Sequence, residues 1–156
     1  MIYIYLILLL IIFYQDSKER KVSAWVLITT IVLGGTIYYL NTLPSVFILN
    51  VSTNIGFILI IIGILHLYSK FKMKKKINEG IGLGDVLFFI TLAVSFPITS
   101  FLILLSLSLV FSLLLFLIVK PNLQQKVAPL AGLQALFLFI ILFINLTFNF
   151  VNLYAL

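Results

Sequence analysis

Long runs of apolar residues, separated by short polar breaks, constrain this chain more than any other feature. Of its 156 residues, 63% are hydrophobic and only 9% are charged, whereas soluble domains are about half apolar and about one quarter charged. A membrane β-barrel would instead show alternating segments of about 10 residues. The pattern predicts an all-α membrane protein, with residues 1–156 forming a single polytopic domain.

The apolar runs predict six transmembrane helices. Their expected approximate ranges are 1–15, 23–40, 46–68 (or from 52), a fourth ending near Pro97, a fifth ending near 119, and 129–150. The fourth run, 86–96, is too short to cross an apolar core of about 30 Å. Its helix is therefore expected to begin well before Asp85, which would place Asp85 at the membrane surface or slightly below it.

The positive charges are distributed with complete asymmetry. All ten Lys and Arg residues fall in the segments 16–22, 69–84 and 120–127. Because cytoplasmic loops are enriched in these residues, the asymmetry predicts a multi-pass protein of the cytoplasmic (inner) membrane with both termini on the extracytoplasmic side. Topology thus accounts for the net charge of +6 without a nucleic acid partner. The lysine cluster at 70–76 is expected to attract anionic membrane lipids.

The only two aspartates, Asp16 and Asp85, fall on the predicted cytoplasmic side. Two carboxylates held close together cannot both ionise easily, so one retains a proton. The ionised member can then activate a water molecule and the protonated member can protonate the substrate, which is general acid–base catalysis without a metal or cofactor. Glycines before Asp85 would allow the backbone to approach an extended substrate closely; they are Gly80, Gly82 and Gly84.

Structural roles are the alternatives for these polar residues. Asp85 could simply cap a helix, and Asp16 could be the N-cap of the second helix or an ion-pair partner of Arg20 or Lys21. Gln134 is expected to form a hydrogen bond between helices. The glycines at 34–35 and 56–63 are expected to permit close helix packing.

Three segments resemble one family of membrane proteases. Gly82-Leu83-Gly84-Asp85 matches the GxGD motif of membrane aspartyl proteases, and residues 16–23 (DSKERKVS) are similar to the Asp-x-x-x-Arg-x-[Ile/Val] segment of type IV prepilin and archaeal preflagellin peptidases. Residues 127–132 (VAPLAG) resemble the proline-containing start of that family's last helix.

The resemblance implies a function and a set of site residues. The family cleaves the short basic leader of pilin-like precursors at the cytoplasmic membrane face, so the expected partner is such a precursor. Asp16 and Asp85 would be the catalytic pair. The residues expected to shape the site or to bind substrate are Gly80, Gly82, Gly84, Arg20 and Pro129.

Two departures from the family pattern bear on this expectation. Leu87 stands where many members carry a lysine. The cysteine-containing N-terminal segment linked to methylation in bifunctional members is also missing, so peptidase activity alone is expected. Two alternatives are a catalytically inactive subunit that assists pilus or secretion assembly and a small proton-coupled transporter, although a transporter would favour carboxylates near mid-membrane.

Overall fold

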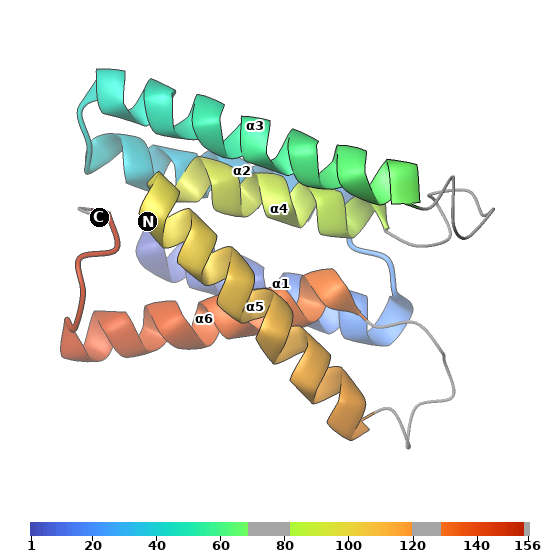
Figure 1. The fold of residues 1–156 in the computed structure, drawn as a ribbon. Helices are drawn as coiled ribbons and strands as arrows, with labels where there is room; N and C mark the ends of the chain where they lie inside the picture. Colours follow the sequence, from blue (N-terminus) through green and yellow to red (C-terminus); the bar gives the residue numbers. More distant parts are fainter. Residues whose placement is uncertain (69–81, 120–128, 155–156) are drawn as a thin grey trace.

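The computed structural model describes residues 1–68, 82–119 and 129–154, and within them the chain is all-helical. The described residues form six helices, as the apolar runs predict, and Figure 1 shows their arrangement. Their bounds are α1 Ile2–Glu19, α2 Ala24–Leu40, α3 Pro44–Tyr68, α4 Leu83–Ser95, α5 Ile98–Val119 and α6 Leu130–Phe148.

The helices form two neighbouring groups with an oblique helix across them (Figure 1). α2, α3 and α4 run side by side, and α2 packs most extensively on α4. α1 packs along α6, and α5 crosses the bundle obliquely against α6. The start of α1 and the end of the described C-terminal segment lie at one end of the bundle. α1 passes into α2 at the opposite end, where α4 and α6 also begin.

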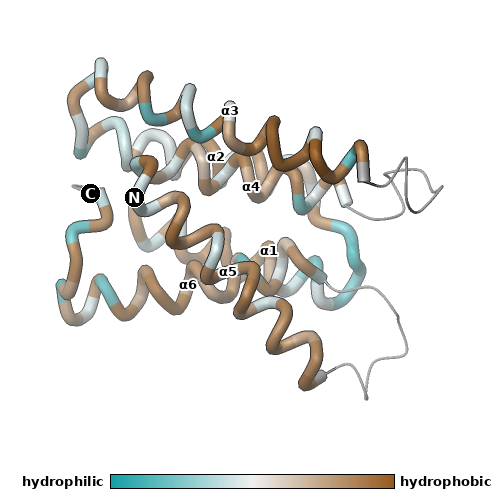
Figure 2. The backbone as a smooth tube through the Cα atoms, in the orientation of Figure 1, coloured by the Kyte–Doolittle hydropathy of each residue, from teal (hydrophilic) through white to brown (hydrophobic). Residues whose placement is uncertain are grey.

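Most of the helical backbone is coloured brown, for apolar residues, in Figure 2, with paler and teal polar positions between them. Three helices, α3, α5 and α6, are long and apolar enough to cross a membrane. α2 and α4 are apolar but shorter, and α1 carries charged residues in its last turn. Composition and helix length together therefore identify a membrane protein.

The start of α4 differs from the expectation. The helix begins at Leu83, two residues before Asp85, and its 13 residues span about 20 Å. It starts there because the Asp85 carboxylate accepts a hydrogen bond at 3.1 Å from the amide of Gly82, whose backbone is extended. The expectation that this helix begins well before Asp85 was wrong.

The turn between α4 and α5 is built around Pro97. Proline lacks an amide hydrogen and disfavours helix at the preceding residue, and Phe96 is accordingly extended. The buried side chain of Asn54 on α3 donates to the carbonyls of Ala93 and Phe96 at 3.0 and 2.9 Å. This amide satisfies carbonyls that the broken helix leaves without partners.

Glycines allow α2 to approach α4 closely. A Cβ atom added at Gly34 would collide with the side chain of Ser95, and one at Gly35 would lie 2.7 Å from Val94 Cγ1. The expected role of this glycine pair in helix packing is confirmed. The same expectation for Gly56 and Gly63 on α3 was wrong, because no atom of the described residues lies within 4 Å of a Cβ added at either position.

This contrast predicts the effect of adding one methyl group at each kind of site. Gly34→Ala should lower the free energy of unfolding by about 1–3 kcal/mol, because it forces α2 away from α4. Gly56→Ala is the matched control and should be neutral or stabilising by up to about 1 kcal/mol. Thermal unfolding in detergent measures both, and equal melting temperatures for the two variants would contradict the packing role of Gly34.

Candidate functional site

Asp16 lies in the last turn of α1, with 7% of its surface exposed. The helix continues past the predicted apolar run to Glu19. The next residue, Arg20, takes the left-handed conformation (φ 55°) and donates its amide to the Asp16 carbonyl. The N-cap position of α2 is occupied by Ser23. The alternative role of Asp16 as the N-cap of the second helix was therefore wrong.

Asp85 lies in the first turn of α4 and is half-buried. One of its oxygens, Oδ2, accepts the Gly82 amide described above. The helix-capping role considered for this residue is thus real, but the carboxylate has a second oxygen that points to another helix. Asp85 therefore both caps α4 and contacts α6.

The N-terminus of α6 brings the two carboxylates together. Asp85 Oδ1 accepts a hydrogen bond from the Ala131 amide at 2.8 Å, and Asp16 Oδ2 accepts one from the Gly132 amide at 2.6 Å. The N-cap residue, Pro129, forms no side-chain cap. Two consecutive amides that would otherwise lack partners are thus satisfied by carboxylates from α1 and α4.

Gly132 is required for this close approach. A Cβ atom there would lie 2.8 Å from Asp16 Cβ, 3.0 Å from Asp16 Oδ2 and 3.3 Å from the Phe13 carbonyl oxygen. Two of these atoms belong to the backbone or to the first carbon of a side chain, so they cannot move without shifting α1. The absence of a side chain at Gly132 therefore permits the contact between α1 and the start of α6.

Burial raises the pKa of both carboxyl groups. Asp16 follows the apolar stretch 2–15 and Asp85 precedes the one at 86–96, so neither lies within an apolar run. Burial raises the pKa of Asp16, while the Gly132 amide and the Arg20 charge act in the opposite direction. Burial also raises the pKa of Asp85; the Gly82 and Ala131 amides oppose this, and the nearby charge of Asp16 adds to it. Such a pair is suited to sharing one proton.

The other predicted site residues are distributed around the two carboxylates. Arg20 is the C-cap of α1, Gly82 is the N-cap of α4 and Pro129 is the N-cap of α6. A Cβ atom at Gly84 would make only an ordinary contact, 3.9 Å from Val22 Cγ2. Gly80 lies outside the described residues. Leu87, in place of the family's lysine, packs against the hydrophobic core.

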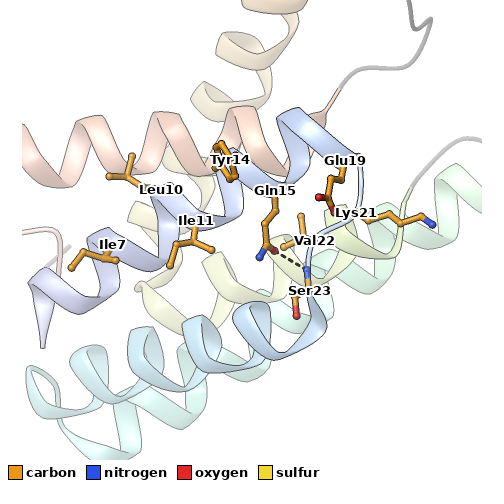
Figure 3. Close-up of a pocket in the computed structure, with 9 residues that line it drawn as sticks. All are labelled: Ile7, Leu10, Ile11, Tyr14, Gln15, Glu19, Lys21, Val22 and Ser23. Carbon is orange, nitrogen blue, oxygen red and sulfur yellow. Dashed lines mark hydrogen bonds between the residues drawn. The ribbon is translucent and has the colours of Figure 1, made fainter.

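An open groove of about 600 Å³ lies along another face of α1 (Figure 3). Apolar side chains line most of it, and Gln15, Glu19, Lys21 and Ser23 form its polar end. The Gln15 side chain accepts the Ser23 amide at 2.9 Å and so ties α1 to the start of α2. Neither Asp16 nor Asp85 lines this groove, so it is separate from the carboxylate pair.

Two features of α6 were not predicted from the sequence. Residues 127–132 carried the resemblance, but nothing in them indicated that the amides of Ala131 and Gly132 would bind the carboxylates. Gln134 was expected to bond across helices, yet neither polar atom of its buried side chain has a partner within the described residues.

One comparison with known proteins identifies a family. The model of the type IV leader peptidase family matches residues 3–118, which include both aspartates. Searches of curated proteins and of solved structures gave no match.

The raised pKa of Asp16 predicts a pH-dependent effect of Asp16→Asn on stability. Because the folded state retains this proton to a higher pH than the unfolded state, the ionised group costs stability above its raised pKa. Asparagine can still accept the Gly132 amide without the charge. Asp16→Asn should therefore be more stable than the parent at pH 7, and the margin should shrink as the pH falls towards 3.8, the ordinary value. Melting temperatures measured across this range in detergent test this, and a margin that grows on acidification would contradict it.

Proposed function

The chain belongs to the type IV leader peptidase family, and we propose that it is an aspartyl endopeptidase that removes the leader of type IV prepilin-like or preflagellin-like precursors at the cytoplasmic membrane face. One observation carries the proposal for the active site. Asp16 and Asp85 bind consecutive amides at the start of α6, so the only two aspartates of the chain converge although they are far apart in sequence.

The pair can hydrolyse a peptide bond by general acid–base catalysis. The ionised carboxylate removes a proton from water, and the water oxygen attacks the carbonyl carbon while the protonated carboxyl donates to the carbonyl oxygen. When the tetrahedral intermediate collapses, the C–N bond breaks and the leaving nitrogen receives a proton from the pair. Protons are conserved over the cycle, and no metal or covalent intermediate is needed.

The proposed topology places this chemistry at the inner face of the membrane. The described basic residues next to the site, Lys18, Arg20 and Lys21, lie where α1 passes into α2. By the positive-inside rule this end of the bundle is cytoplasmic. The start of α1 and the end of the described C-terminal segment lie at the opposite end in Figure 1, so both termini are proposed to be extracytoplasmic. We propose that the chain crosses the inner membrane six times. The short α4, about 20 Å long, would cross where the apolar core is locally thinned, leaving Asp85 at its inner edge.

The two alternative functions, an inactive assembly subunit and a proton-coupled transporter, make different demands on the aspartates. An inactive assembly subunit would support pilus or secretion assembly equally well with Asp16→Asn or Asp85→Asn. A proton-coupled transporter would need carboxylates part-way along the bundle. The position of both aspartates at helix ends favours the peptidase.

The catalytic assignment predicts that each aspartate is essential for cleavage. Asp16→Asn and Asp85→Asn should each lower the rate by at least about a hundredfold, because the pair loses a proton donor or acceptor. The measurement is processing of a coexpressed, tagged type IV prepilin, with the folded state of each variant checked by thermal unfolding. Cleavage at the parent rate by either variant would eliminate the proposed active site.

The geometry of Gly132 predicts a loss of cleavage without any change to a carboxylate. Gly132→Ala should push Asp16 away from the start of α6 and reduce processing of the same prepilin by about a hundredfold, the effect expected of a displacement near 1 Å. Gly63→Ala adds the same methyl group where no atom lies within 4 Å, and it should leave the rate unchanged. Equal rates for the two variants would argue against a role for this helix contact.

A further inference from the structure

Gln134 is a buried polar residue that the packing of the helices does not explain. Its side chain on α6 is completely inaccessible, and neither its amide nitrogen nor its carbonyl oxygen has a hydrogen-bond partner within the described residues. Other buried polar side chains, such as Ser108 and Ser112, donate to carbonyls of their own helix. Because an unpartnered buried amide is costly, this one requires a partner that the described helices do not supply.

We propose that Gln134 is a third polar side chain of the carboxylate site and that its carboxamide positions the attacking water beside Asp85. The inference rests on the proposed function and adds a residue to it. Gln134 would be a water-positioning residue, whereas the two aspartates perform the proton transfers.

The position of Gln134 on α6 directs it towards Asp85. Residues three apart lie on the same face of a helix, so Gln134 shares a face with Ala131, whose amide binds Asp85 Oδ1. Side chains on a helix lean towards its N-terminus, so that of Gln134 covers the turn containing Ala131. Gly132, which faces Asp16, is two residues away and therefore on a different face.

The chemistry of the two groups suits a shared water. Each oxygen of Asp85 accepts one amide, and a carboxylate oxygen can accept a further hydrogen bond. A carboxamide has both an acceptor and donors, so it can orient a water molecule whose other hydrogen points to the carboxylate. A water between these groups would satisfy the orphaned amide and would be ready for deprotonation by Asp85.

Gln134→Met tests this inference, because methionine has a similar length and no hydrogen-bonding group. We expect kcat for cleavage of a tagged prepilin to fall by about tenfold or more, with KM within about twofold of the parent, since substrate binding is not altered. The melting temperature should stay equal or rise, because an unpartnered amide has been removed. If Gln134 had only a packing role, the substitution would not lower kcat while leaving the melting temperature equal or higher.

Leu138→Met is the matched control, since Leu138 is buried on the same face of α6 one turn further from the carboxylates. It should leave kcat unchanged. A fully active Gln134→Met, in an assay where the parent cleaves and Asp16→Asn does not, overturns this inference but not the proposed function. A Gln134→Met protein that does not fold would make the amide structural and would also overturn it. A parent that cleaves no prepilin overturns the proposed function, and the inference with it.

Discussion

The site and much of the bundle depend on two hydrogen bonds at the start of α6. Through them, two amides of α6 bind the carboxylates of Asp16 and Asp85. An α-helix begins with amides that have no partner within the helix. Ala131 and Gly132 are buried, so their amides need acceptors from the protein. α6 begins with Pro129 and forms no side-chain cap of its own. Asp16 and Asp85 supply the acceptors instead, from α1 and α4. The same contact therefore closes the bundle at this end and gathers the acidic groups.

This arrangement also limits the charge that the site can hold. The N-terminus of a helix carries a partial positive charge, equivalent to about half an elementary charge. It therefore compensates one ionised carboxylate better than two, and burial disfavours the second negative charge further. The junction therefore favours a pair that shares one proton. That state is also the one that general acid–base hydrolysis requires, so the fold itself prepares the pair for the proposed reaction.

The sequence predicted the main features of the fold from properties that do not depend on detailed packing. Apolar run lengths gave six helices, and they occur near the expected ranges. The basic residues led us to expect Asp16 and Asp85 at the cytoplasmic face, and that membrane orientation remains a prediction. The two carboxylates do bind neighbouring amides at the start of α6. The predicted start of α4 was wrong because it was inferred from the thickness of the membrane. The hydrogen bond between the Gly82 amide and Asp85 fixes the N-terminus of the helix locally instead. Neither the role of Gly132 nor the unpartnered state of Gln134 could be read from the chain, because each depends on helices that are distant in sequence.

A second contact explains why Asp16 and Asp85 arrive at the same level. Tyr5 on α1 donates its buried hydroxyl to Ser95 on α4 at 3.3 Å, near the end of the bundle that holds the chain termini. Asp16 follows Tyr5 by eleven residues, and Asp85 precedes Ser95 by ten. In helices that run in opposite directions, both intervals cover about 15–17 Å. With Tyr5 and Ser95 in contact, the two carboxylates therefore lie at about the same level along the bundle. The first amides of α6 can bind both of them because neither has to move far along its helix axis.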